Sequence, residues 1–302
     1  MIRLTSVSKH YVSLVRRRRV DALADFSMEL RRGEVVGIAG PNGAGKSTLI
    51  SLMLGFLHPT SGQVTVDGQR PRAYVESQGI GYLTELVNLP PRWKVPATLE
   101  RMAALSGIPG SERAAAVQGM MTRLGLDEHA AKQVRQLSKG NLQRLGLGQA
   151  LLGEFDIVVL DEPTHGLDPV WTQRFRDVVA DLRRPDRLVV IASHNLDELE
   201  LLADRVAILN HGRLQRIVEH GTGVTNAALM VWRISFEGTP DVTAALPGAV
   251  EVTSRPGTWR CTASRAELSA GLAVLLGGGA ILVECAPEES RLETEFRAAV
   301  GS

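Results

Sequence analysis

A glycine-rich segment followed by lysine and serine is the feature that most constrains how this chain can fold. Residues 40–48 read Gly-Pro-Asn-Gly-Ala-Gly-Lys-Ser-Thr and satisfy the phosphate-binding pattern G-x-x-x-x-G-K-[ST] in full. An apolar run at 35–39 precedes the segment and another at 49–54 follows it, so a strand and a helix are predicted on its two sides. Glycines let backbone N–H groups turn inward at a helix N-terminus, where they bind phosphate. The segment therefore predicts a nucleoside triphosphate site on an α/β fold.

The residues of this loop have separate expected roles. Lys46 should reach the β- and γ-phosphates, and the Ser47 hydroxyl should ligate Mg²⁺. The other loop residues expected around the nucleotide are Asn42, Gly43, Gly45 and Thr48. An ordinary glycine-rich turn between strand and helix is the alternative, and the complete pattern with its apolar flanks argues against it.

Length and composition restrict the class of protein but do not indicate an activity. The 302 residues suffice for one large domain and a small one. A formal net charge of +1 gives no reason to expect a nucleic acid partner. No apolar run approaches the roughly 20 residues needed to span a bilayer, and the first residues lack the layout of a secretory signal. Cys261 and Cys285 are expected to be free thiols in a reducing compartment.

A second chemistry-bearing pattern is Asp-Ile-Val-Val-Leu-Asp-Glu-Pro at residues 156–163. Its unbroken run of apolar residues predicts a central parallel strand covered on both faces. Asp161 at the carboxyl end of this strand is placed to hold Mg²⁺, directly or through water. Glu162 is expected to lie near the γ-phosphate and to polarise an attacking water. The alternative, in which the two acids only cap the strand, is weakened by the loop at 40–48.

The segment Leu-Ser-Lys-Gly-Asn-Leu-Gln-Arg at 137–144 resembles the signature motif of ATP-binding-cassette (ABC) proteins, whose consensus is L-S-G-G-Q. Lys139 replaces the first glycine and Asn141 replaces the glutamine. Ser138 and Gly140 keep a hydroxyl and a bare backbone at the start of a helix, where phosphate is attracted. The resemblance implies that these two residues contact the γ-phosphate held by an opposite subunit, so that two cassettes enclose two ATP molecules.

Further motifs resemble the family in the expected order. The segment Gly-Leu-Asp-Pro resembles the D-loop, in which Asp168 would communicate across the dimer. Ser-His-Asn follows an apolar strand at 188–192 and resembles the switch segment, so His194 would contact the γ-phosphate. Tyr11 matches the aromatic residue that stacks on adenine, because tyrosine offers a flat apolar face.

One position departs from the usual cassette. The strand at 79–83 leads into Thr-Glu, so Glu85 stands where the family has the glutamine of the Q-loop. Glutamate still offers an oxygen to Mg²⁺ or water, but it adds a negative charge beside the metal. Together with the Leu-Ser-Lys-Gly form of the signature, this variant resembles the ATPase subunits of ABC-2-type transporters.

The order of predicted elements gives the fold class. We expect an α/β P-loop NTPase cassette with a mostly parallel sheet core, an antiparallel β subdomain and a helical subdomain, plus a small C-terminal α+β domain. The cassette is expected over 1–220, with its helical subdomain at about 86–152, and the accessory domain over 221–302. The order strand, helix, strand, strand, helix, strand suggests a ferredoxin-like accessory domain. The expected helices are 97–106, 111–124 and 142–152 in the cassette and 240–246, 266–276 and 288–300 in the accessory domain.

These features indicate an ATP-hydrolysing subunit of an ABC transporter. It would dimerise head-to-tail around two ATP–Mg²⁺, lie at the cytoplasmic face of the membrane and drive a separate integral membrane permease, without a nucleic acid partner. Two alternatives stay open. A non-transport ABC ATPase acting on ribosomes or DNA usually carries a second cassette or a long insertion, which this sequence does not show. A degenerate regulatory module is the other, and four intact residues argue against it: Lys46, Asp161, Glu162 and His194.

Three features have more than one interpretation. The run Arg16–Arg19 fits contact with anionic lipid or nucleic acid, and it equally fits the solvated tip of an antiparallel hairpin. Trp93, flanked by basic residues, suits either an interface with a membrane subunit or local packing. The accessory domain could support the dimer, regulate it or contact a partner. The transported substrate is not readable from the sequence.

Overall fold

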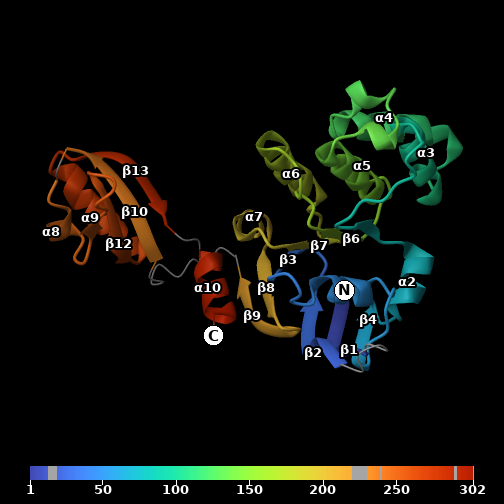
Figure 1. The fold of residues 1–302 in the computed structure, drawn as a ribbon, viewed down its shortest axis with the longest axis horizontal. Coiled ribbons are helices and arrows are strands. Elements are labelled where there is room, and N and C mark those ends of the chain that lie inside the picture. The colour runs from blue at the N-terminus through green and yellow to red at the C-terminus, as the bar shows by residue number, and fades with distance from the viewer. Residues whose placement is uncertain (13–18, 220–229, 239, 289–290, 302) are drawn as a thin grey trace. The chain divides into compact units, whose positions relative to one another are not determined.

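The computed structural model describes residues 1–12, 19–219, 230–238, 240–288 and 291–301. The chain divides into two compact units, Met1–Glu219 and His220–Ser302. Figure 1 shows the elements of both.

A six-stranded sheet forms the centre of the first unit, in the order β5–β6–β7–β3–β8–β9. All neighbouring strands are parallel except β8 and β9. The strands are β3 (Val35–Ala39), β5 (Gly81–Leu83), β6 (Ile157–Asp161), β7 (Leu188–Ser193), β8 (Arg205–Asn210) and β9 (Arg213–Glu219). β3, β6 and β7 are buried along their whole length. Their unbroken apolar runs therefore reflect a sheet covered on both faces.

The hairpin of β8 and β9 closes through His211 and Gly212, which have φ angles of 46° and 73°. Positive φ at both central residues gives the turn a twist that matches the flanking strands. Residues 205–219 therefore form a tight antiparallel hairpin at one edge of the central sheet.

A three-stranded antiparallel sheet, in the order β2–β1–β4, packs beside the phosphate-binding loop. Its strands are β1 (Ile2–Val12), β2 (Arg19–Leu30) and β4 (Ser61–Val66). β1 and β2 pair as an antiparallel hairpin, one of the two interpretations given above for the run Arg16–Arg19. Ser6 and Asp25 have φ angles of 46° and 52° where the pairing of β1 with β2 shifts register. Such bulges interrupt the two-residue alternation that identifies a strand in a sequence.

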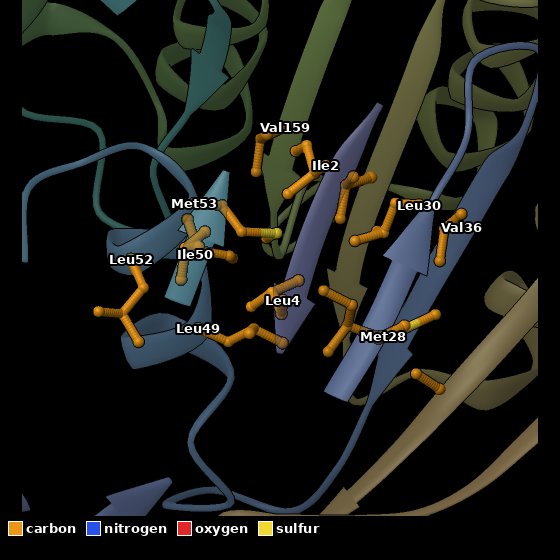
Figure 2. Packing of buried hydrophobic residues seen from close by; sticks show 14 of the residues in the cluster. Ile2, Leu4, Met28, Leu30, Val36, Leu49, Ile50, Leu52, Met53 and Val159 are labelled. Carbon is orange, nitrogen blue, oxygen red and sulfur yellow. The ribbon is translucent and has the colours of Figure 1, made fainter. Parts of the chain in front are cut away.

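One apolar cluster joins this small sheet to the central sheet and to helix α1 (Lys46–Met53). Figure 2 shows Leu4 of β1, Met28 of β2 and Met53 of α1 in this cluster. Burying large aliphatic side chains is worth about 1.5–3 kcal/mol each. Helix α1, which begins at Lys46, is thus anchored on its buried face.

The helices α3 (Val95–Leu105), α4 (Gly110–Arg123) and α5 (Lys139–Leu151) lie together as a helical subdomain, green in Figure 1. α5 begins three residues earlier than predicted, so Gly140 lies inside its first turn. The unexpected α2 (Pro71–Gln78) starts with proline at its first position, as helices tolerate. The other helices of this unit are α6 (Pro169–Leu182), α7 (Leu196–Leu202) and the short 3₁₀ helices η1 (Asp127–His129) and η2 (Val134–Gln136). Over the described ranges, no helix has the length and apolar character needed to cross a membrane.

Two of the ambiguous features are partly resolved by local contacts. The Arg101 guanidinium lies 4.3 Å from the centre of the Trp93 ring, so this indole packs against its own subdomain. Of the run Arg16–Arg19, only Arg19 is among the described residues; it begins β2 and pairs with Asp21 at 2.7 Å. The other three arginines lie outside the described residues.

The second unit is built on an antiparallel sheet in the order β11–β12–β10–β13. Its elements in chain order are β10 (Met230–Glu237), α8 (Val242–Ala245), β11 (Val250–Glu251), β12 (Thr258–Ala263), α9 (Arg265–Gly277), β13 (Ile281–Pro287) and α10 (Arg291–Val300). The helix expected at 240–246 is therefore a single turn. Cys261 is buried and Cys285 half-buried, and both are free thiols. Burial raises the pKa of each, so both are protonated and unreactive near neutral pH.

Candidate nucleotide site

The chemistry-bearing residues meet because neighbouring parallel strands end at the same edge of the sheet. Ala39 of β3 lies beside Ser193 of β7, and Ala192 of β7 lies beside Asp161 of β6. β5 ends level with β6. The loops that follow β3, β5, β6 and β7 therefore converge at one crevice, where open α/β sheets bind their ligands.

The phosphate-binding loop curls around the ammonium group of Lys46. This side chain is only 8% exposed, and its Nζ donates to the carbonyl oxygen of Gly40 at 2.7 Å. Gly45 precedes α1 with φ of 106°, and a Cβ there would lie 2.4 Å from the carbonyl oxygen of Ala22. Only glycine fits this position, both for its dihedral angle and for the close approach of the neighbouring strand. The first N–H groups of α1 have no partner within the helix, so the loop is formed as an anion site.

A cavity of about 450 Å³ opens in front of this loop. A volume of this size suits a small-molecule ligand. Tyr11 is on its wall, 42% exposed, and presents a ring that Lys9 approaches to 5.5 Å. The lining residues are Tyr11, Val20, Asp21, Ala22, Pro41, Asn42, Gly43, Ala44, Gly45, Lys46, Ser47, Thr48, Glu85, Asp161 and Glu162.

Glu162 is held in one orientation by residues that follow β7. Its Oε2 accepts hydrogen bonds from the Ser193 hydroxyl at 3.2 Å and from Nδ1 of His194 at 2.8 Å. An ionised carboxylate only accepts, so His194 must carry its proton on Nδ1. The other oxygen, Oε1, lies 3.9 Å from Nζ of Lys46. Glu162 also adopts a left-handed φ of 47°, a cost that such an arrangement tolerates at a functional site.

The carboxylates of the cavity outnumber its cations. Asp161 is 3% exposed, and burial raises its pKa to about 7, with the negative charges of Glu85 and Glu162 adding to the shift and Lys46 opposing it. A divalent cation would relieve this excess of negative charge. Carboxylate and hydroxyl oxygens are ligands that Mg²⁺ prefers, and Ser47 supplies the hydroxyl.

This donor set suits a metal that arrives with a nucleotide. No group of three or more His, Cys, Asp or Glu that could enclose a metal occurs in the part of the chain that the structure describes. Mg²⁺ usually keeps waters and binds through one or two carboxylates together with substrate phosphates. Asp161, Glu85 and Ser47 therefore fit Mg²⁺ bound with phosphate.

Ser138, Gly140 and Asp168 do not line this cavity. Ser138 caps α5 by accepting from the backbone N–H of Asn141 at 3.3 Å, and Asp168 caps α6 by accepting from that of Trp171 at 2.9 Å. A Cβ on Gly140 would lie 2.8 Å from the carbonyl oxygen of Gly166, so glycine allows the two segments to touch. The signature and the D-loop thus meet each other away from Lys46.

Several polar residues that support the site had no role in the sequence analysis. Gln143 of α5 is buried, and its Nε2 donates to the backbone carbonyls of Glu162 at 3.1 Å and Pro163 at 3.2 Å. The Thr164 hydroxyl donates to Oε2 of buried Glu198 at 2.5 Å. No signal in the sequence indicated Gln143, because the residues of α5 show no division into an apolar and a polar face.

Comparison with known proteins places the chain in a family. A family model described as ABC transporter matches residues 23–165. An uncharacterised ABC transporter ATP-binding protein of Nostoc sp., all4389, is 37% identical over 202 residues, which are 65% of this chain and 59% of that protein. The ABC transporter ATP-binding protein NatA of Bacillus subtilis is 31% identical over 218 residues, 71% of this chain and 87% of NatA.

Solved structures with a similar fold belong to the same family. A dimeric structure of MJ0796, a bacterial ABC transporter cassette, aligns with a TM-score of 0.67 and 25% identity and covers 73% of this chain and 99% of that cassette. The chain thus spans less than two thirds of the Nostoc protein but most of NatA and of the solved cassette. With these relatives and this site, the chain belongs to the family of ABC transporter ATP-binding proteins.

Proposed function

We propose that this chain is an ATP-binding and ATP-hydrolysing subunit of an ABC transporter. The observation that carries the proposal is the environment of Glu162, whose carboxylate is oriented by Ser193 and His194 beside the phosphate-binding Lys46. A carboxylate fixed in this way is suited to orient and deprotonate a water that attacks a γ-phosphate. Lys46 would leave Glu162 and the loop carbonyls to bind the phosphates.

The remaining cavity residues fit the nucleotide and its metal. Tyr11 would stack on the adenine, and the backbone of Asn42 to Thr48 would bind the phosphates. Ser47, Asp161 and Glu85 would hold Mg²⁺, which supplies charge neutralisation between the β- and γ-phosphates when bound. His194 would contact the γ-phosphate through the nitrogen that does not face Glu162.

A second subunit would complete the site. Ser138, Gly140 and Asp168 lie outside the cavity of their own chain, so we assign Ser138 and Gly140 to the nucleotide of a partner and Asp168 to the dimer contact. A helix N-terminus capped by Ser138 attracts phosphate, as the signature role requires. The partner in this proposal is a second copy of the chain.

We also propose the finer assignment. Glu85 in place of the Q-loop glutamine and Lys139 in the signature favour an ABC-2-type subunit, at the cytoplasmic face of the membrane beside a separate permease. The test is to co-express the chain with candidate multi-span membrane proteins from its own genome and to purify either partner in detergent. We expect co-purification in a 2:2 ratio or with one double-length permease, and ATPase activity that changes on reconstitution in vesicles. A chain that never associates with a membrane protein and hydrolyses ATP only with ribosomes or DNA would contradict the transport assignment.

Glu85 gives a prediction specific to this chain. Because an oxygen ligand is kept in Glu85→Gln but removed in Glu85→Ala, we expect the glutamine variant to bind ATP nearly as wild type and to shift its Mg²⁺ dependence. The alanine variant should lose roughly tenfold more hydrolysis, the usual size of a lost supporting metal contact. ATPase rates titrated with Mg²⁺ measure this, with Glu112→Ala on the outer face of α4 as a control. Superimposable Mg²⁺ curves for all variants would refute the role of Glu85.

A further inference from the structure

Asn141, the residue that replaces the signature glutamine, is fully engaged within its own chain. Its Oδ1 accepts a hydrogen bond from Nη2 of Arg144, and its Nδ2 lies 2.5 Å from Nε2 of His129. Both partners are only 7% exposed. The signature amide is therefore a half-buried link between the first turn of α5 and η1, the 3₁₀ helix that follows α4.

These contacts fix the proton on His129. Arginine has no acceptor, so the atom of Asn141 that faces Arg144 must be the amide oxygen. The amide NH₂ then faces His129, whose Nε2 must accept. The imidazole is neutral in this arrangement and carries its proton on Nδ1. That buried Nδ1 has no hydrogen-bond partner among the described residues, so the tautomer is set by Asn141 rather than by Nδ1's own surroundings.

Arg144 extends the link to the D-loop helix. Its Nη1 donates to the backbone carbonyls that end α4, at 3.0 Å to Leu124 and 3.1 Å to Gly125. Its guanidinium lies 4.1 Å from the ring centre of Trp171 in the first turn of α6. The backbone N–H of Trp171 is the one that Asp168 caps. One chain of contacts thus runs from η1 through the signature to the residue proposed to face the dimer partner.

We propose that His129, Asn141 and Arg144 form a proton-sensitive relay that positions the signature and the D-loop for the partner's nucleotide. The proposal rests on the signature role assigned above to Ser138 and Gly140. Protonation of Nε2 would set one donor against another, and the amide cannot rotate without turning its NH₂ toward Arg144. Acidification should therefore break the link and lower ATP hydrolysis.

The charged groups around His129 have opposing effects on the protonation of its ring. Oε1 of Glu128 lies 3.8 Å from Nε2 of His129 and favours the protonated ring, and Asp127 and Asp168 line the same cavity. Arg144 and Arg174 of that cavity oppose protonation. Nε2 of His129, which must accept from Asn141, therefore lies near side chains of both signs.

The first test compares pH profiles of kcat. Glutamine can accept from Asn141 at any pH, so His129→Gln should stay active and lose the acidic limb between about pH 8 and about pH 6. Wild type should fall about fivefold more than this variant over that range, the net worth of one hydrogen bond. His129→Leu cannot accept and should be slow throughout, and exposed His58→Gln should follow wild type.

Asn141→Asp should also remove the pH dependence. A carboxylate accepts from Arg144 and can accept from Nε2 of His129 whether the ring is protonated or is the neutral Nε2–H tautomer, so the acidic fall in kcat seen in wild type should be lost in this variant. Profiles that coincide for wild type, His129→Gln and Asn141→Asp would overturn the relay. A Ser138→Ala variant distinguishes failure of the relay from failure of the proposed signature role. Full activity in Ser138→Ala would reject the signature role itself.

A measurement independent of activity examines the tautomer. In ¹⁵N spectra of the histidine-labelled chain, assigned by loss of one signal in His129→Gln, wild type should show the Nδ1–H form. Asn141→Leu should release the ring to another tautomer. An Nε2–H imidazole in wild type would overturn the relay whatever the kinetics show.

Discussion

Glu162→Gln is expected to bind ATP, to lose hydrolysis and to accumulate as a closed dimer. Glutamine keeps the size of the side chain and an oxygen that Ser193 and His194 can still reach, so the loop after β6 should keep its shape. The amide cannot accept the proton of an attacking water. Removing a positioned general base typically costs about 10²–10⁴-fold in rate. The bound nucleotide would then remain between the two subunits.

Two measurements are needed for this variant. Steady-state phosphate release should fall by that factor while ATP affinity stays within a few-fold of wild type, and size-exclusion chromatography with ATP should show a dimer that wild type forms only transiently. Glu100→Gln, an exposed carboxylate on α3, is the matched control and should behave as wild type in both. A Glu162→Gln protein that stays monomeric with ATP would contradict the two-subunit site, and one that still hydrolyses ATP would remove Glu162 as the base.

The cavity residues were predictable because their positions follow from strand order alone. Lys46 lies in the loop and helix that follow β3, Asp161 ends β6, and His194, which contacts Glu162 at the edge of the cavity, follows β7; parallel strands must end at one edge of their sheet. Glu85 could be placed by the same reasoning, although its residue type departs from the family. The local sequence pattern therefore predicts the position of a site residue when that residue lies at or just after the end of a central strand.

The supporting contacts and the small sheet could not be predicted in this way. The roles of Gln143 and Asn141 depend on which backbone carbonyls and side chains from distant segments meet them, and no local pattern records that. The extent of β1 and β2 could not be predicted, because the bulges at Ser6 and Asp25 interrupt the alternation of both strands. The start of α5 was placed too late because glycine disfavours a helix interior, whereas here the cap at Ser138 and contact with Gly166 outweigh that preference.

Lys46→Met is expected to abolish ATP binding at ordinary concentrations. The ammonium is already stripped of most water and rests on the Gly40 carbonyl and beside Glu162, so its transfer to the phosphates needs little further desolvation. Methionine has a similar length and fills the space without a charge. Each charge-assisted hydrogen bond is worth about 1.5–3 kcal/mol, so losing two phosphate contacts should weaken ATP binding by roughly 10²–10⁴-fold.

The loss must be separated from unfolding, because Lys46 also compensates the buried charge of Glu162. Thermal denaturation without nucleotide reports the fold, and titration with a fluorescent ATP analogue reports binding. We expect Lys46→Met to fold, since the apolar face of α1 is untouched, but to melt below wild type because the buried Glu162 carboxylate loses its counter-charge, and to lose the stabilisation that Mg²⁺–ATP gives wild type. Exposed Lys94→Met should keep both properties. Nucleotide-dependent stabilisation of Lys46→Met equal to that of wild type would mean that the ammonium held by this loop does not bind the phosphates, and the assignment of the cavity would then fail at its centre.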